Sequence, residues 1–247
     1  MGIIWQSFLV SLVGGLLSLD RTAAFQIMVS RPIVTAPIIG YILGDAAIGL
    51  LIGVMLELLF VGGLPIGGYI PPHEVMITVL ITAISLMGQN VLNSIGFDRF
   101  PWKFAGSDMV FVLGAALLMM LPLDVICKKV DVIVRNLNIR FFNAAMAELN
   151  KGGIQGIVGN NLKGLGVFFS LNFITLFVLN LAGVMIVYFF FLFLPVTAIM
   201  ALPLACASVF IIGLSSVYNT SYGRSSLPVF LGAVFFAVII LTMVIGR

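Results

Sequence analysis

Long apolar runs separated by short polar breaks make up most of this chain. A helix that crosses the hydrocarbon core of a bilayer needs about 20 mainly apolar residues. The runs that meet or approach this length are Ile3–Leu19, Phe25–Leu43, Ile48–Ile70, Val75–Ile95, Met109–Ile126, Leu165–Leu194, Val196–Leu214 and Leu227–Ile245. The pattern therefore predicts an all-α fold, a polytopic membrane helical bundle that forms a single membrane domain over residues 1–247.

The apolar stretch from Leu165 to Leu214 is too long to be one membrane span. Proline removes a backbone donor and clashes with the preceding helical turn, so helices bend or end at it. Pro195 and Pro203 lie inside this stretch. We expect two helices there, bent or separated near these prolines, among the C-terminal spans of residues 164–247.

Glycine, proline and polar residues interrupt the apolar runs of residues 1–74. Backbone groups freed by a broken helix are costly in hydrocarbon unless protein or trapped water satisfies them. Interrupted segments at membrane depth are therefore typical of transport sites that line a cavity. The sequence predicts broken or re-entrant helices in this N-terminal third, around a substrate region. The alternative is that glycines such as those of Gly40-x-x-x-Gly44 only permit close helix packing.

Residues 128–163 form the one sizeable polar region, with half of the chain's 12 basic residues. Basic loops tend to stay on the cytoplasmic side of a membrane. Apolar residues recur at helical spacing between Val130 and Ala145, and Asp131 and Arg135 lie on the opposite face. We expect a cytoplasmic amphipathic helix, either anchored at the membrane surface or docked to a cytoplasmic partner. A flexible connector is expected after it, at Gly152, Gly153, Gly156 and Gly159.

Composition supports membrane embedding and excludes several classes of function. Apolar residues make up 62% of the chain and charged residues only 9%, against about 25% charged in a typical soluble domain. The basic residues form no stripe with interleaved aromatics, so we expect no nucleic-acid binding. Cys127 and Cys206 are isolated, and no phosphate-cradling loop or dinucleotide fingerprint occurs. We therefore predict no metal and no cofactor.

Glu57 is the strongest single indication of function, because it lies inside the apolar run Leu50–Phe60. An ionised carboxylate at membrane depth is costly unless it is paired or faces water. A carboxylate accepts hydrogen bonds at both oxygens, so Glu57 could hold two hydroxyls of a sugar. The structural alternative is a buried ion pair with Arg21 or Arg31.

His73, the single histidine, lies in Pro-Pro-His-Glu, directly before the apolar run that starts at Val75. One histidine beside Glu74 provides neither a metal-ligand set nor a catalytic triad. A lone loop histidine is usually structural, but its position beside the predicted cavity makes substrate contact the alternative. Glu74 either complements the dipole of the helix that follows or joins His73 at the substrate.

Five further polar residues flank the breaks in the N-terminal third. Four of them straddle the first break, where they either pair with one another or line a polar path: Asp20, Arg21, Gln26 and Arg31. Asp45 follows Gly44 and precedes a new apolar run, which is the pattern of a helix N-cap.

The residues Ser30-Arg-Pro-Ile-Val-Thr-Ala-Pro-Ile-Ile-Gly-Tyr-Ile-Leu-Gly-Asp45 resemble the Arg-Pro…Gly…Gly-Asp signature of IIC subunits of mannose/fructose/sorbose-type phosphotransferase systems. Ile48–Glu57 continues the match, which is strong over Asp20 to Val79. Beyond that, the resemblance rests on length, hydropathy and the central basic loop. By position, the family's motif residues correspond to Asp20, Gln26, Arg31, Pro32, Gly44, Asp45 and Glu57.

The resemblance implies a role in sugar import. In this family, IIC forms a membrane complex with a IID subunit, sugar binds between membrane segments, and a cytoplasmic IIB phosphocarrier, charged by IIA, phosphorylates the emerging sugar. IIC carries no phosphoryl group, so this chain is expected to be a permease subunit and not an enzyme, located in the bacterial cytoplasmic (inner) membrane in an oligomeric complex. The substrate-binding residues expected are Asp20, Gln26, Arg31, Glu57, His73 and Glu74.

One departure from the family pattern and two rival functions stay open. An acidic residue directly follows the last proline in the family, whereas His73 does so here, with Glu74 next; the sugar is therefore not assigned as mannose. One rival is an ion-coupled secondary transporter of a small polar solute that uses Glu57 as a proton or sodium site. The other is a membrane scaffold that transports nothing.

Overall fold

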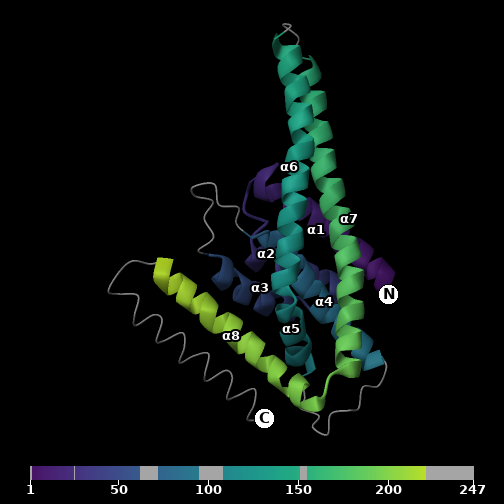
Figure 1. The fold of residues 1–247 in the computed structure, drawn as a ribbon, viewed down its shortest axis with the longest axis vertical. Coiled ribbons are helices and arrows are strands. Elements are labelled where there is room, and N and C mark those ends of the chain that lie inside the picture. The colour runs from purple at the N-terminus through teal and green to yellow at the C-terminus, as the bar shows by residue number, and fades with distance from the viewer. Residues whose placement is uncertain (1, 25, 62–71, 95–107, 151–154, 221–247) are drawn as a thin grey trace.

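A computed structural model describes residues 2–24, 26–61, 72–94, 108–150 and 155–220, and every regular element in these ranges is an α-helix (Figure 1). The helices are α1 (Ile3–Thr22), α2 (Pro32–Leu43), α3 (Ala46–Phe60), α4 (Glu74–Ser94), α5 (Asp108–Leu118), α6 (Met120–Asn150), α7 (Gln155–Phe193) and α8 (Val196–Thr220). The prediction of an all-α bundle is confirmed. The expected span Leu227–Ile245 lies outside the described residues.

Helix α4 is the centre of the bundle. It contacts α1, α2, α3, α5, α6 and α7, and all of its residues from Val75 to Gly88 are buried. A helix that is apolar on every side is buried rather than amphipathic, and α4 forms most of the core. By length and composition, α1, α4, α7 and α8 could each cross a membrane, and the bent pair α5–α6 could be a fifth span among the described residues.

Helices α2 and α3 form a short hairpin in place of two full spans. They contain 12 and 15 residues, and a helix rises 1.5 Å per residue, so neither crosses a bilayer alone. Gly44 ends α2 with φ = 100°, a left-handed conformation that glycine adopts readily. The Asp45 carboxylate accepts a hydrogen bond from the Ile48 N–H at 2.9 Å and caps α3. The broken helices predicted for the N-terminal third are thus confirmed.

The cap at Asp45 leads to a stability prediction. Asp45→Ala leaves the first turn of α3 without its acceptor, and losing an N-cap costs about 1 kcal/mol. We expect a lower unfolding temperature for the detergent-solubilised protein. Thermal unfolding followed with a fluorescent dye that does not react with cysteine thiols measures it. Asp45→Ser is the control, because a serine hydroxyl caps the same N–H; an Asp45→Ala variant as stable as the wild type would contradict the assignment.

Glycines in the hairpin allow the backbones of α2 and α3 to touch. A Cβ atom added at Gly49 would lie 2.5 Å from the Ala36 carbonyl oxygen, and one at Gly53 would lie 2.7 Å from that of Pro32. The packing alternative thus holds for these two glycines and for Gly40, where an added Cβ would lie 3.0 Å from the Gly49 Cα atom, but not for Gly44, where nothing lies within 4 Å. The double glycines and prolines between residues 62 and 71 lie outside the described part of the chain.

The expected span Met109–Ile126 is broken: the chain bends by 52° between α5 and α6, and by length and composition the bent pair could still be one span. Pro122 lies in the first turn of α6. Its ring clashes with a helical carbonyl four residues earlier, so α5 cannot run on through it. The break predicted near Pro195 is present between α7 and α8, whereas Pro203 lies inside α8.

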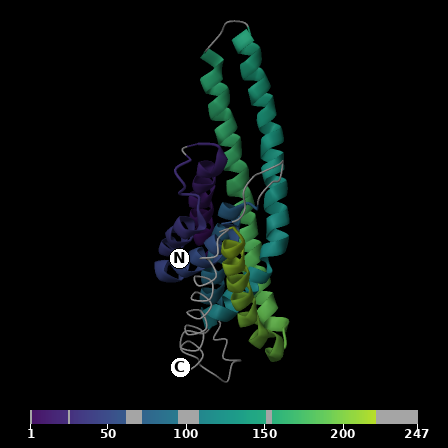
Figure 2. The same cartoon turned by 90° about the vertical axis from the view of Figure 1, so that its left-hand side faces the viewer.

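Helices α6 and α7 pack against each other and extend as a long antiparallel pair beyond the rest of the bundle (Figures 1 and 2). We use the name arm for residues 135–150 of α6 and 155–165 of α7. The amphipathic helix expected within the polar region 128–163 is the later part of α6, which packs against α7. Gly156 and Gly159 lie within α7 and not in a connector.

Candidate functional site

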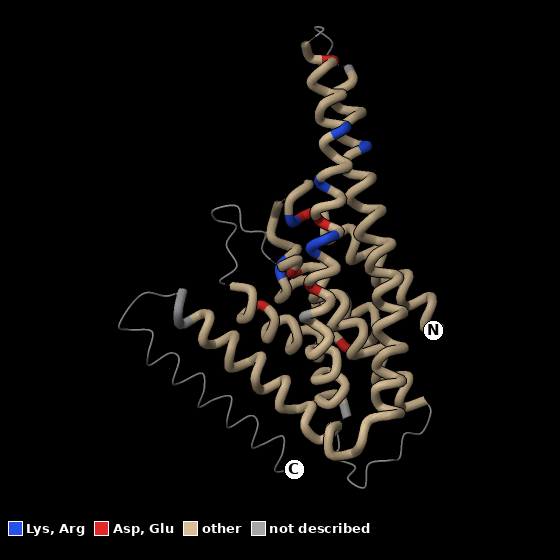
Figure 3. Tube along the Cα trace, in the orientation of Figure 1, with Lys and Arg blue, Asp and Glu red and all other residues tan. Residues whose placement is uncertain are grey.

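The C-terminal end of α1 and the N-terminal ends of α2 and α4 meet near the base of the arm. Helix α1 ends at Thr22, α2 begins at Pro32, and α4 begins at Glu74. Figure 3 shows the charged residues gathered along the arm and around its base, while most of the remaining helical surface carries other residue types. A helix N-terminus leaves N–H groups unpaired and favours nearby negative charge. The ends of these helices therefore concentrate polar groups in an otherwise apolar bundle.

Arg31 lies between two carboxylates from different helices. Its Nη1 atom is 3.7 Å from Oε1 of Glu57 and 3.4 Å from Oε2 of Glu74. The second oxygen of Glu57 accepts a weak hydrogen bond from the Ile33 N–H at 3.3 Å, at the start of α2. We call Arg31, Glu57 and Glu74 the carboxylate clamp. The ion pair considered for Glu57 is thus present, with Arg31 as the partner.

The carboxylate clamp is accessible and has unused hydrogen-bonding capacity. The side chains of Glu57 and Glu74 are 20% and 21% exposed, and that of Arg31 is 35% exposed. Two carboxyl groups offer several lone pairs, and one guanidinium occupies only some of them. The clamp holds two acidic side chains and one basic side chain. It is therefore an open polar site and not a sealed salt bridge.

Asp20 organises the loop between α1 and α2. Its carboxylate accepts hydrogen bonds from the backbone N–H groups of Ile27 at 2.7 Å and Ser30 at 3.0 Å. In this loop Gln26 and Met28 adopt positive φ angles of 52° and 68°, a conformation that needs local support in residues other than glycine. Asp20 is 7% exposed, so its charge is directed at the backbone that leads into Arg31.

Gln26 lies on the exposed surface of the same loop. Its amide donates a long hydrogen bond of 3.4 Å to the Thr22 carbonyl at the end of α1. Among the described contacts, Gln26 therefore joins its own loop to α1 and does not reach the carboxylate clamp. The mutual pairing considered for Asp20, Arg21, Gln26 and Arg31 is replaced by separate contacts: Asp20 and Gln26 bind the backbone, Arg31 contacts the two glutamates, and Arg21 contacts other segments.

His73 is buried directly before α4, with 1% of its surface exposed. Its Nδ1 atom accepts a hydrogen bond from the Met76 N–H at 3.4 Å, as an N-cap does. Burial, with a smaller effect of the Arg21 charge, lowers the pKa of His73 to about 3, so the imidazole is neutral. When Nδ1 accepts, Nε2 carries the proton, and this N–H has no partner among the described residues.

Sequence reasoning missed Asp131 as part of this region. Asp131 lies on α6, is 2% exposed as a side chain, and pairs with Arg21 at 3.8 Å. Arg21 also donates to the carbonyl oxygen of Pro72 at 3.1 Å. The polar face of the expected amphipathic helix contained Asp131, but hydrophobic periodicity does not tell which polar residue becomes buried against another helix.

The arrangement suits recognition of a neutral, hydroxyl-rich molecule. Carboxylates accept hydrogen bonds from hydroxyl groups, and a neutral imidazole N–H donates to an oxygen.

The sequence matches a known protein family over nearly its whole length. The family model that describes the sorbose-specific IIC component of phosphotransferase systems matches residues 4–246. The chain belongs to this family. The family resemblance deduced from the sequence is thereby confirmed, and this IIC protein is a multi-pass membrane protein.

Two relatives of this IIC protein from Escherichia coli are themselves IIC components of sugar permeases or phosphotransferase systems. An N-acetylgalactosamine permease IIC component 1 of Escherichia coli (strain K12) is 33% identical over 103 residues, which are 41% of this chain and 38% of that relative. A mannose-specific EIIC component of a phosphotransferase system from the same strain is 23% identical over 150 residues, 61% of this chain and 47% of the relative. The chain thus matches less than half the length of each of these relatives.

A solved structure shares the fold. The cryo-EM structure of the mannose transporter ManYZ in complex with microcin E492 includes a chain that superposes with a TM-score of 0.57 at 20% identity. The alignment covers 98% of this IIC protein and 85% of that chain. The bent α5–α6 pair and the short hairpin thus occur in a chain whose overall fold resembles that of a solved structure.

Proposed function

We propose that this IIC protein is the sugar-translocating membrane component of a mannose/sorbose-type phosphotransferase system. The observation that carries the proposal is the carboxylate clamp, which joins the α2–α3 hairpin to the start of α4. His73 directly precedes Glu74 in the chain, and its Nε2–H has no partner within the described ranges. The partners of the chain would be a IID membrane subunit and the cytoplasmic IIB and IIA phosphocarriers, in an oligomeric complex in the bacterial cytoplasmic membrane.

Each group of the site has a distinct part in this proposal. Glu57 and Glu74 accept hydrogen bonds from sugar hydroxyls, and Arg31 holds the two side chains near each other. The Nε2–H of His73 donates to a sugar oxygen. Asp20 and Gln26 shape the loop that carries Arg31, so they act on the sugar through that residue. No phosphoryl group needs to reside on this chain.

Import would be driven by phosphorylation and not by an ion gradient. The sugar binds from outside among the clamp residues, the site opens towards the cytoplasm, and the IIB subunit transfers a phosphoryl group to the sugar. The added negative charge then prevents return through an apolar bilayer, where a charged group is costly. The pairing of Glu57 with Arg31 supports this order over ion coupling, because a coupling carboxylate must exchange its cation in every cycle.

Uptake into membrane vesicles tests the proposal. Vesicles that contain this IIC protein with its IID partner should accumulate sugar phosphate only when phosphoenolpyruvate and the cytoplasmic phosphocarriers are supplied. The sugars to test include mannose and N-acetylgalactosamine, because the relatives' descriptions name them. Uptake should persist with an ionophore, since no gradient is used.

Two results would contradict the proposal. Uptake that ignores phosphoenolpyruvate and collapses with an ionophore would identify an ion-coupled transporter. Absence of uptake of every sugar, with the complex correctly assembled in the membrane, would favour a scaffold. Vesicles without the IID partner serve as the matched control.

A further inference from the structure

Arg21, next to the last residue of α1, contacts two segments that are far away in the sequence. Its Nη2 atom donates to the carbonyl oxygen of Pro72 at 3.1 Å. Its Nη1 atom lies 3.8 Å from Oδ2 of Asp131 on α6. Arg21 therefore connects the helix that continues into the arm with the segment that leads into α4.

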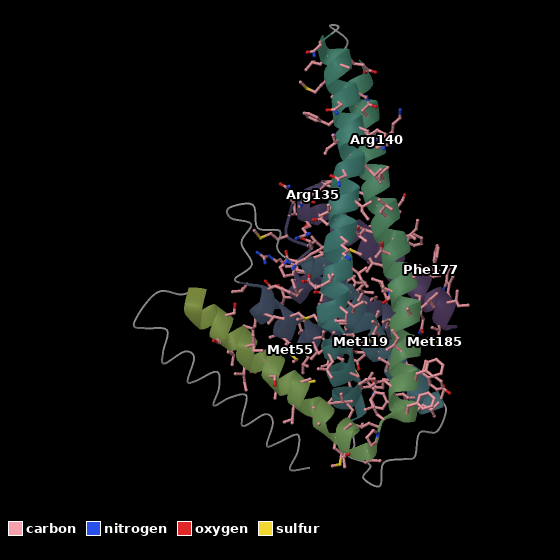
Figure 4. All side chains as sticks on the ribbon, viewed as in Figure 1. Met55, Met119, Arg135, Arg140, Phe177 and Met185 are labelled. Atoms are coloured by element: carbon pink, nitrogen blue, oxygen red, sulfur yellow. The ribbon has the colours of Figure 1, made fainter. Side chains whose placement is uncertain are left out.

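Burial gives this connection weight. The side chains of Arg21 and Asp131 are 8% and 2% exposed. Exposed ion pairs contribute little to stability, but removing one partner of a buried pair leaves a charge without compensation. Arg135, one turn further along α6, also pairs with Oδ2 of Asp131 at 3.1 Å, but its side chain is 55% exposed. Figure 4 shows Arg135 near the base of the arm.

Hydrogen bonds to the Pro72 carbonyl determine where the two residues that follow it lie. Proline has no N–H group, so its carbonyl is the backbone group through which hydrogen bonds can hold it. This oxygen accepts from Arg21 and, at 2.9 Å, from the Glu74 N–H. The next two residues are His73, which caps α4, and Glu74, which belongs to the carboxylate clamp. Displacing Pro72 would therefore displace both groups.

We propose that Arg21 is a positioning residue: held by Asp131, it fixes the Pro72 carbonyl and so sets the places of His73 and Glu74 in the sugar site. The inference rests on the proposed function and adds to it a physical link between α6 and the site. A guanidinium suits this task because its planar fork presents several N–H donors in fixed directions. A movement of α6 at Asp131 would therefore displace the Arg21 side chain, and through it the Pro72 carbonyl and the site.

Asp131→Asn tests the link in the intact membrane complex. The amide keeps the size of the side chain but removes the charge that holds Arg21. We expect the KM for sugar uptake to rise about tenfold, equivalent to about 1.4 kcal/mol of binding free energy, with the maximal rate per assembled complex nearly unchanged. The control is Asp124→Asn, the same change on the same helix, where the carboxylate pairs with the more exposed Lys128 at 2.7 Å; its KM should equal that of the wild type. A wild-type KM for Asp131→Asn would overturn the proposal.

A charge exchange separates positioning from simple helix pairing. The double variant Arg21→Asp with Asp131→Arg restores an ion pair between α1 and α6. A carboxylate cannot donate to the Pro72 carbonyl, however. We expect the amount of complex in the membrane to recover while the KM stays raised. A KM that returns to the wild-type value would show that Arg21 only ties the two helices together, and would overturn the proposal.

A labelling measurement needs no transport and so keeps the two hypotheses apart. Pro72→Cys is placed in a background with Cys127→Ala and Cys206→Ala, and the rate of its reaction with a small maleimide is followed in the membrane complex. The rate should rise several-fold with Asp131→Asn and stay constant with Asp124→Asn. Equal rates in both would refute the positioning role. Absence of phosphoenolpyruvate-dependent uptake by the wild type would refute only the proposed function.

Discussion

Glu57→Gln is expected to lower phosphoenolpyruvate-dependent sugar uptake by about a hundredfold, because a lost charge-assisted hydrogen bond costs up to about 3 kcal/mol. Glu57 pairs with Arg31 at 3.7 Å and accepts from the Ile33 N–H. The amide replaces one acceptor oxygen by a donor, which faces a guanidinium that can only donate. Both the clamp and the proposed contacts with sugar hydroxyls are therefore weakened. Initial rates of vesicle uptake, normalised to the amount of assembled complex, measure the effect.

The control for this variant is Glu148→Gln, the same chemical change at an exposed position on the arm. It should transport at the wild-type rate. Wild-type uptake by Glu57→Gln would remove Glu57 from the sugar site, whereas equal losses in both variants would indicate a general effect of charge on the complex.

Gly49→Ala is expected to disrupt the α2–α3 hairpin. A Cβ atom there would lie 2.5 Å from the Ala36 carbonyl oxygen and 3.0 Å from the Pro37 Cα atom. These are backbone atoms, so no side-chain rotation relieves the clash, and overpacking of this kind costs about 1–3 kcal/mol. The carboxylate clamp would be lost with the hairpin, since Arg31 precedes α2 and Glu57 belongs to α3. Size-exclusion chromatography of the detergent-solubilised protein, with its unfolding temperature, measures the loss.

Gly166→Ala on α7 is the matched control for the hairpin variant. Nothing lies within 4 Å of a Cβ atom added at Gly166, and replacing a glycine inside a helix by alanine stabilises it by about 0.5–1 kcal/mol. The control should therefore be at least as stable as the wild type. An equally stable Gly49→Ala variant would mean that α2 and α3 can separate without unfolding.

The three residues of the carboxylate clamp stand out in the sequence for different reasons. The sequence indicates Glu57 because a carboxylate interrupts an apolar run, Arg31 because it lies at the first break and in the Arg-Pro motif, and Glu74 because it precedes an apolar run. None of these observations predicts that one guanidinium holds both carboxylates. That contact depends on how α2, α3 and α4 pack, and packing joins residues that local periodicity treats separately.

The arm shows the opposite limit of sequence reasoning. Helical spacing correctly indicated a helix over the polar region after Lys128, but the pattern of a surface helix and that of a helix paired with a neighbour are the same. Helix α6 packs against α7, while Ile133 and Phe142 stay exposed. A glycine-rich run also read as a connector, yet Gly156 and Gly159 are helical, because pairing with α6 outweighs their low helix propensity.

The sequence by itself determined the membrane character of the chain, its all-helical class, the hairpin break at Gly44 and Asp45, and the break at Pro195. Each of these depends on interactions within a few residues: burial of an apolar run, a left-handed turn, a cap or a missing N–H group. The tertiary structure alone decided that Arg31 joins Glu57 to Glu74, that Asp131 is buried against Arg21, and that α6 runs into an arm. Charges in an apolar bundle need partners, and only the packing of the helices determines which partner comes within reach.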